Sequence, residues 1–166
     1  MKIKSLATDF IVKEYINIQN DIIDKNDLKN HKSIYLIYKI TKENISTLKI
    51  ADIFLKNNIK IGFIGLKDKY SLSTQYLSFL LPNLNQIFTF NKKIESIFKK
   101  IKNIKNYEFI TYLNRPLRKQ DLIYNEFNIT LRDIDKKELK NYIQKLELFK
   151  NFYFLNFYDD QRFPIK

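Results

Sequence analysis

The distribution of apolar and polar positions along the chain predicts strands interspersed with helices. Runs of about four to eight residues that alternate or stay apolar are typical of strands, whereas apolar residues about three or four positions apart are typical of helices. Strands are expected over residues 10–18, 33–40, 59–64, 72–80, 107–113 and 127–131. Helices are expected over residues 46–57, 92–102 and 135–150.

Helix starts and the segments between elements support this division. Ser46 or Asn44 is placed to cap the first helix, and Asp135 is placed to cap the last. Residues 19–32 form a polar loop and residues 114–123 a basic loop. The pattern therefore predicts an α/β fold of the α+β type, with a mixed, largely antiparallel sheet and helices packed on it.

Length and composition limit the class of protein. The 166 residues are enough for one domain with a buried core, expected over 1–166, and a hydrophobic content of 45% argues against disorder. Thirty Lys and Arg against eighteen Asp and Glu give a net charge of +12. Such a surplus favours a polyanionic partner such as RNA. A bias of the coding sequence toward lysine is the alternative.

Several classes of protein are excluded by residues that the chain lacks. The sequence contains no cysteine and one histidine, His31, so we expect no disulfide, no metal site and no zinc deaminase chemistry. No apolar run reaches the roughly 18 residues of a membrane span, and the first residues do not resemble a secretory signal. A cytoplasmic protein that uses no metal is expected.

One loop is the best candidate for chemistry. The two glycines of the chain, Gly62 and Gly65, both lie near it, where the backbone can come close to a partner. The loop presents a single carboxylate, Asp68, between Lys67 and Lys69. An Asp in a polar loop is most often a turn former or a solvated charge. The other possibility is an acid that a loop at a strand end presents to a ligand.

Five segments along the chain carry a recognisable set of motifs. They are Asp9-Phe10-Ile11-Val12-Lys13-Glu14; Ser46-Thr47 with Ala51; Gly65-Leu66-Lys67-Asp68-Lys69 with Thr74-Gln75; Arg115, Leu117 and Arg118 with Asn125 and Phe127; and 156–163. In this order they resemble motifs of the TruD family of RNA pseudouridine synthases. The third segment contains the loop just described, and its Asp68 matches the family's catalytic carboxylate.

The resemblance has departures and covers part of the family's length. Other residues stand at several positions where the family carries glycine. The loss of these glycines implies local strain or lost contacts. These positions are Asn44, Gln120, Tyr124, Asp159 and Pro164. The chain resembles the N-terminal part of the family's catalytic domain, so we expect the inserted family domain and the C-terminal strands to be absent.

The resemblance implies a site built around Asp68. Lys4 would form an ion pair that keeps this carboxylate charged, although a lysine near a frayed end is as readily expected. Tyr158 or Phe157 would stack on the uracil and Asn156 would bind its edge, whereas the neighbouring Phe152 and Phe154 are expected in the core. The remaining motif residues are given structural roles: Glu14, Gly65, Thr74, Gln75, Asn125, Phe127, Gln161, Arg162 and Phe163.

Basic residues of two loops are candidates for RNA contacts. Lys67 and Lys69 flank Asp68, and Arg115, Arg118 and Lys119 lie in the basic loop, which suits phosphate binding. A solvated cluster of charges is the usual alternative for such a run.

The function that the resemblance implies is isomerisation of uridine to pseudouridine in tRNA, by resemblance at position 13. The reaction breaks the N-glycosidic bond and rejoins the uracil through carbon, and it needs neither metal nor cofactor. It does need an ionised carboxylate beside the sugar. The alternatives are an inactive remnant that binds RNA, and one half of an enzyme whose second chain supplies the rest.

Overall fold

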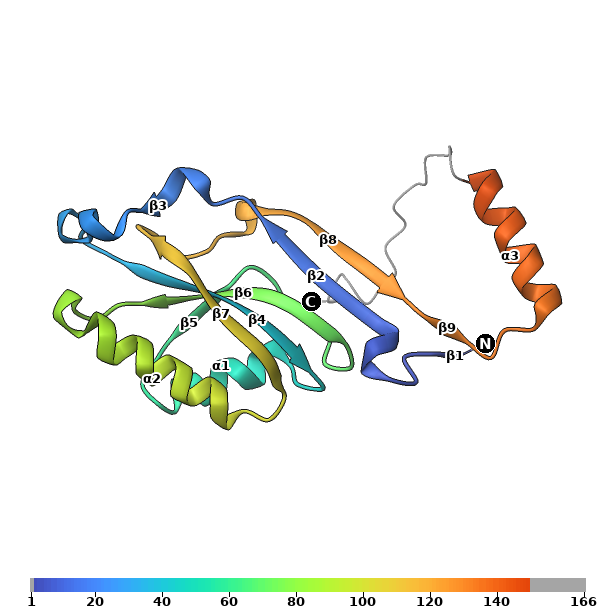
Figure 1. The fold of residues 1–166 in the computed structure, drawn as a ribbon, viewed down its shortest axis with the longest axis horizontal. Coiled ribbons are helices and arrows are strands. Elements are labelled where there is room, and N and C mark those ends of the chain that lie inside the picture. The colour runs from blue at the N-terminus through green and yellow to red at the C-terminus, as the bar shows by residue number, and fades with distance from the viewer. Residues whose placement is uncertain (1, 150–166) are drawn as a thin grey trace, which may run out of the picture. The chain divides into compact units, whose positions relative to one another are not determined.

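The computed structural model describes residues 2–149 and divides into two compact units, Lys2–Arg132 and a second unit that contains one described helix (Figure 1). The expected single-domain organisation stays a prediction. The strands are β1 (Lys2–Ile3), β2 (Phe10–Ile16), β3 (Ile22–Ile23), β4 (Tyr35–Glu43), β5 (Ile61–Phe63), β6 (Leu72–Leu80), β7 (Ile104–Leu113), β8 (Leu122–Ile129) and β9 (Leu131–Arg132). The α-helices are α1 (Thr47–Leu55), α2 (Ile87–Lys100) and α3 (Lys136–Phe149).

Seven of the described strands form one sheet. Its order is β3-β7-β4-β6-β2-β8, and β5 pairs with β6 beside this path. The pair β2–β6 is parallel and the other pairs are antiparallel. The prediction of a mixed, largely antiparallel sheet with packed helices is confirmed. A separate pair, β1–β9, lies outside this sheet.

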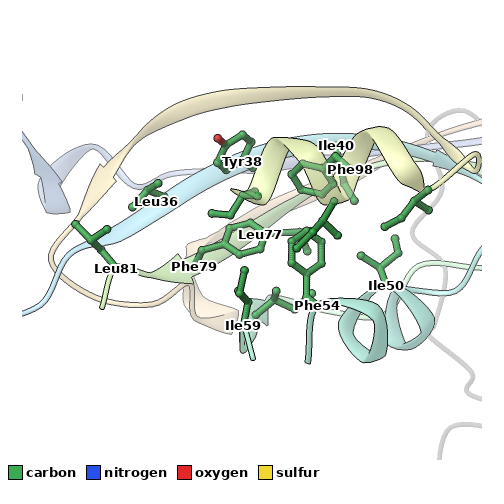
Figure 2. Packing of buried hydrophobic residues seen from close by; sticks show 14 of the residues in the cluster. Leu36, Tyr38, Ile40, Ile50, Phe54, Ile59, Leu77, Phe79, Leu81 and Phe98 are labelled. Carbon is green, nitrogen blue, oxygen red and sulfur yellow. The ribbon is translucent and has the colours of Figure 1, made fainter. Parts of the chain in front are cut away.

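The core lies between one face of the sheet and the helices α1 and α2 (Figure 2). Side chains alternate between faces along a strand, so Leu36, Tyr38 and Ile40 of β4 point to the same side. Phe54 of α1 and Phe98 of α2 pack against this side, with ring centroids 5.1 Å apart. Burial of these large side chains stabilises the fold by roughly 1.5–3 kcal/mol each.

Most predicted elements are present, with shifted ends. The strand expected at 72–80 is β6, and the helix expected at 46–57 is α1, capped by Ser46, whose Oγ accepts a hydrogen bond from the Lys49 backbone N at 3.1 Å. The helix expected at 92–102 begins earlier, at Ile87, because a 3₁₀ turn that starts behind Asn83 leads directly into α2. The Asn83 side chain accepts from the Asn85 backbone N at 2.9 Å.

Three other segments are more regular than the pattern predicts. The expected loop at 19–32 contains β3 and two 3₁₀ turns, Gln19–Asp21 and Lys25–Asn30. Strands β7 and β8 begin several residues before the predicted starts, because pairing with β4 and β2 extends each strand beyond the run that its own pattern marks. The aromatic tail, with Phe152 and Phe154, lies outside the described residues.

Candidate active site

Asp68 lies in the loop between β5 and β6, and both of its carboxylate oxygens are held. Oδ1 accepts a hydrogen bond from the Tyr70 backbone N at 2.8 Å, and Oδ2 forms an ion pair with Lys4 Nζ. About a third of each of the two side chains, 34%, is exposed. Asp68 is therefore fixed in position and still open to a ligand.

The N-terminal segment that carries Lys4 is anchored. Strand β1 pairs with β9, and Arg132 at the end of β9 donates two hydrogen bonds to Asp9 Oδ1, at 2.9 and 2.7 Å. Lys4 adopts a left-handed backbone conformation with φ of 60°, and its Nζ lies 4.2 Å from the centroid of the Phe10 ring. These contacts direct the lysine toward Asp68 rather than into solvent.

The surroundings of Asp68 keep it ionised. The hydrogen bond from Lys4 is the largest cause that lowers the pKa of Asp68 below its usual value, and it outweighs the opposing effect of burial. The bond from the Tyr70 backbone N and the charge of Lys42 lower this pKa further. Asp68 is thus a carboxylate at neutral pH, as a nucleophile or base must be.

A buried lysine supports the Asp68 loop. Lys42, at the end of β4, is fully buried, and its Nζ donates to the backbone oxygens of Ile45 at 2.8 Å and of Asp68 at 2.9 Å. The Ser71 hydroxyl donates to the same Asp68 oxygen at 2.9 Å. Burial lowers the pKa of Lys42 to about 8. Because Lys42 lies just beyond the strand expected at 33–40, the sequence pattern did not single it out.

Lys67 lies in the interior. Its Nζ donates to Glu14 Oε1 at 2.5 Å, and the two side chains are 7% and 1% exposed. Glu14 Oε2 accepts from the Tyr76 backbone N at 3.0 Å. This pair ties the Asp68 loop to β2 and β6. A phosphate contact by Lys67, expected from its place beside Asp68, does not suit this position.

Other motif residues complete the support. The Thr47 hydroxyl donates to Gln75 Oε1 at 2.9 Å and accepts from the Lys67 backbone N at 3.2 Å. Thr74 faces the opposite side of the sheet, where its Oγ1 lies 3.2 Å from Thr41 Oγ1. Gly65 has open space where a side chain would begin, so the space around it does not require glycine.

Gly62 is the more crowded of the two glycines. A Cβ there would lie 2.5 Å from Ser78 Oγ, so a substitution would force the Ser78 hydroxyl to move. Neither glycine has positive φ; of the positions where the resemblance expects glycine, Asn44 takes this conformation, with φ of 54°. Asn tolerates the left-handed region better than most residues, so little of the expected strain arises there.

Asp68 borders a small pocket of about 230 Å³. Asn125 and Phe127 of β8 line it, opposite the Asp68 loop. Pairing of β2 with β8 places Phe127 beside Val12 and Asn125 beside Glu14, on the face where Lys67 lies. The Phe127 side chain is 57% exposed, and the buried Asn125 Oδ1 has no hydrogen-bond partner among residues 2–149.

Asn125 and Phe127 line the Asp68 pocket, which goes beyond the structural role expected for them. Nothing in their local pattern shows which distant strand they pair with, so their proximity to Asp68 is visible only in the folded sheet. Their spacing as Asn-x-Phe puts both on one face of a strand, which was the available signal.

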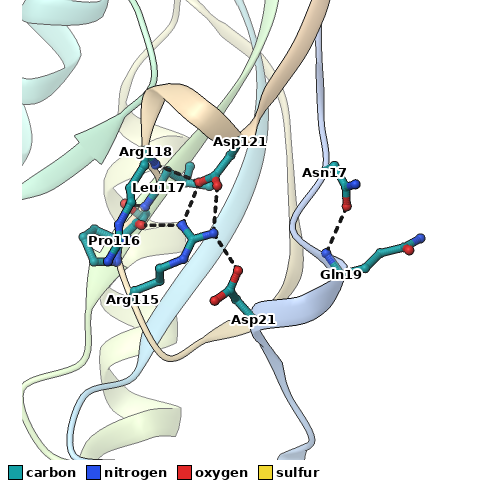
Figure 3. A network of polar contacts seen from close by, with 9 residues as sticks. Asn17, Gln19, Asp21, Arg115, Pro116, Leu117, Arg118 and Asp121 are labelled. Atoms are coloured by element: carbon teal, nitrogen blue, oxygen red, sulfur yellow. Dashed lines mark hydrogen bonds and ion pairs between the residues drawn. The ribbon is translucent and has the colours of Figure 1, made fainter.

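The basic loop is held by internal ion pairs, as Figure 3 shows. Arg115 donates from its two terminal nitrogens to Asp121 at 2.8 and 2.7 Å and to Asp21 Oδ2 at 2.6 Å. Its side chain is 13% exposed, so it fixes the loop and is poorly placed for the expected phosphate contact. The backbone N of Arg118 donates to Asp121 at 2.7 Å. The side chains of Arg118 and Lys119 are exposed.

Burial raises the pKa of Asp121, but the hydrogen bonds from Arg115 and the Arg118 backbone N lower it more, so the net shift is downward. The loop is therefore a charged, satisfied network. None of its residues is among those that line the Asp68 pocket. The expected uridine-binding residues Asn156, Phe157 and Tyr158, and the motif residues Gln161, Arg162 and Phe163, lie outside the described residues.

A family model described as tRNA pseudouridine synthase D (TruD) matches residues 1–166. The chain belongs to the TruD family. A relative from Methanocaldococcus jannaschii named "Probable tRNA pseudouridine synthase D 1" is 36% identical over 173 residues, which cover 97% of this chain and 41% of the relative. A tRNA pseudouridine synthase D from Aquifex aeolicus is 28% identical and matches 98% of this chain and 39% of its own length.

A solved TruD structure supports the fold. The crystal structure of a Methanosarcina mazei protein named for tRNA pseudouridine synthase D matches 98% of this chain and 35% of its own chain, with a TM-score of 0.69 and 25% identity. The chain thus spans about two fifths or less of the length of these relatives.

Two negative findings concern residues 2–149. That range contains no group of three or more His, Cys, Asp or Glu side chains placed to hold a metal ion. None of its helices combines the length and apolarity needed to cross a membrane.

Proposed function

We propose that this TruD chain carries the catalytic carboxylate of a tRNA pseudouridine synthase, and that Asp68 is this group. The observation that supports it best is an ionised, one-third-exposed carboxylate beside a small pocket with an aromatic wall and an unsatisfied amide oxygen. The proposed substrate is tRNA, at the uridine of position 13 by family resemblance.

The pocket suits a single planar base. Its volume of about 230 Å³ is below the roughly 300–1,000 Å³ typical of pockets for drug-sized ligands. Extrusion of the target uridine from the RNA stack costs a few kcal/mol. Stacking on the exposed ring of Phe127 would offset about 1–3 kcal/mol of this. Asn125 also lines the pocket, and its side chain would bind the uracil edge after a rotamer change that turns the buried, unpartnered Oδ1 toward the base.

The carboxylate and its neighbours divide the chemistry. Asp68 acts at the ribose, either as a nucleophile on C1′ or as a base that removes a sugar proton. Lys4 keeps it charged, and Lys42 fixes the backbone from which it projects. The exposed Lys69, Arg118 and Lys119 stay proposed RNA contacts, and Tyr158, Phe157 and Asn156 stay proposed contacts of the uracil.

The test is pseudouridine formation in unmodified tRNA, mapped by carbodiimide labelling and primer extension. The chain as given is compared with Asp68→Asn, and circular dichroism checks that the variant folds. We expect modification by the chain and none by Asp68→Asn, because an amide neither attacks C1′ nor takes up a proton. Phe127→Ala is expected to slow the reaction, and Tyr70→Ala, which keeps the Asp68 carboxylate, is the matched control on the other side of the loop.

Absence of product from both chains, with tRNA still bound, contradicts catalysis by this chain and identifies an RNA-binding module. Product that forms only after addition of a second chain identifies one half of a two-chain enzyme. Full activity of Asp68→Asn contradicts the role of Asp68.

A further inference from the structure

A groove of about 730 Å³ lies beside the Asp68 loop. The start of α1, the end of α2 and the turn before β7 enclose it. Its floor is made of the aliphatic side chains of Ile45, Ile53, Ile97 and Ile101, which also belong to or pack against the core. The floor is therefore continuous with the packed core.

The rim of the groove is cationic. Lys49 of α1, Lys69 of the Asp68 loop, Lys100 of α2 and Lys102 beyond it line the groove, and all four side chains are exposed. No Asp or Glu lines it. Four positive charges without a carboxylate among them create a local field that attracts anions.

Three of these lysines lack the carboxylate partners that Lys105 and Lys13 have. Lys105 pairs with Glu43 at 2.7 Å and Lys13 pairs with Glu126 at 3.0 Å, so their charges are partly neutralised within the protein. Lys49, Lys100 and Lys102 form no ion pair with a carboxylate of residues 2–149. Their charges remain available to an external anion.

The groove and the Asp68 pocket lie on two sides of one loop. Asp68 lines the pocket and the next residue, Lys69, lines the groove, and their Cα atoms are about 3.8 Å apart along the chain. Asn44 lines both the groove and a further cavity of about 510 Å³ that includes Lys4 and Tyr70. A polyanion in the groove would thus pass within reach of the loop that presents Asp68.

We infer that this lysine-rimmed groove binds the phosphodiester backbone of the RNA next to the target nucleotide. The inference rests on the proposed function. Lysines bind phosphates as point charges, and the apolar floor fits the carbon side of the riboses between them. An acidic segment of a protein has similar charge. RNA is favoured because the groove adjoins the loop of the proposed catalytic acid.

The test measures binding of unmodified tRNA at several salt concentrations. The triple variant Lys49→Ala, Lys100→Ala, Lys102→Ala removes rim charges and leaves Lys69 and the Asp68 loop unchanged. Its affinity should fall about tenfold at moderate salt, and the slope of log K against log salt should become shallower by about three, since each lost phosphate contact reduces it by about one.

The matched control removes the same charge elsewhere. Lys25→Ala, Lys29→Ala, Lys32→Ala changes three exposed lysines near the start of β4, at the end of that strand far from Lys42. It should leave the affinity within about twofold of the parent and the salt slope nearly unchanged. An equal loss in both triple variants would show that only net charge matters and would overturn the inference.

Two assays keep this inference separate from the proposed function. If tRNA binding depends on the groove lysines but no pseudouridine forms, the groove inference stands and the proposed catalysis is refuted. Product formation with unchanged tRNA affinity in the Lys49/Lys100/Lys102 variant would refute the groove alone. Polyglutamate is the probe for an acidic protein segment. If the Lys49/Lys100/Lys102 variant loses affinity for polyglutamate and keeps its affinity for tRNA, the inference is overturned. If the parent chain does not bind tRNA at all, both the inference and the proposed function are overturned.

Discussion

One face of the sheet has an apolar end and a polar end. On the paired strands β4 and β6, Leu36 lies opposite Phe79 and Tyr38 opposite Leu77, whereas Lys42 lies opposite Ser73. All of these side chains are buried. The same ladder therefore continues from a hydrophobic core into a buried polar cluster beneath the Asp68 loop.

The two ends are stabilised differently. Contacts at the apolar end are non-directional, so several aromatic rings fill the space and share the energy of burial. At the polar end each buried donor or acceptor needs a partner with the correct geometry, because an unsatisfied group costs about 1–3 kcal/mol. Gln75 Nε2 and Asn125 Oδ1, both near this end, have no partner within residues 2–149. The polar end therefore carries a cost that the apolar end does not.

The largest expected change in stability comes from the apolar end. Phe54→Ala removes a fully buried ring that contacts Phe79 and Phe98, and it should lower the free energy of unfolding by about 4 kcal/mol. Urea denaturation followed by circular dichroism measures this change. Leu48→Ala, on the exposed side of the same helix, should change it by less than about 0.5 kcal/mol. Similar effects of the two substitutions would contradict a core located between α1, α2 and the sheet.

The buried ion pair should give the next largest effect. Glu14→Gln leaves the Lys67 ammonium buried without a counter-charge and should cost about 3 kcal/mol of unfolding free energy. The double variant Glu14→Leu, Lys67→Met removes both charges and should lose less than the single variant. Glu126→Gln is the control, because its partner Lys13 is about half exposed, at 49%, and the pair contributes at most about 1 kcal/mol.

A single variant that is no less stable than the double variant would contradict the dependence of Lys67 on Glu14. The measurement is again urea denaturation at neutral pH, for all three variants and the parent.

The smallest effect, and the one most specific to the polar end, depends on pH. Folding lowers the pKa of Lys42 from the ordinary 10.5 to about 8, so between these values the unfolded chain binds more protons than the folded one. Stability of the parent relative to Lys42→Met should therefore rise as pH increases from about 8 to 10.5, by roughly 1–3 kcal/mol. Unfolding curves of both proteins across this range measure the difference.

Lys42→Met also removes two hydrogen bonds from the Asp68 loop. Lys39→Met, three residues earlier and on the opposite, less buried face of β4, is the control and should show no such trend. A parallel pH dependence of the parent and Lys42→Met would contradict the lowered pKa of the buried lysine.

Local patterns predicted a large part of this fold. The strand-like run at 72–80 predicts β6 with its observed ends. Ser46 is one of two predicted caps, because its hydroxyl satisfies a backbone N–H whatever the helix packs against. The motif around Asp68 indicated the family, which the comparisons confirm. Patterns of this kind depend on neighbours in the sequence, so they survive without knowledge of the fold.

The roles of individual charged residues were not accessible in this way. Arg115 and Lys67 are basic residues of the kind that contact RNA, yet both pair with carboxylates of this chain. Lys67 pairs with Glu14, and Arg115 pairs with Asp21, and both partners are distant in sequence. Whether a lysine faces solvent or a buried acid is decided by strand pairing, which a local pattern does not contain.

The sequence by itself determined most of the strands, the three α-helices, the family and the identity of Asp68 as the candidate acid, because these follow from local periodicity and a contiguous motif. Only the tertiary structure decided that Lys4 reaches Asp68, that Asn125 and Phe127 line its pocket, and that Lys42 supports its loop. These contacts join residues from different elements. They form when the strands pair and the helices pack on the sheet, because each polar group that becomes buried is costly unless it finds a partner.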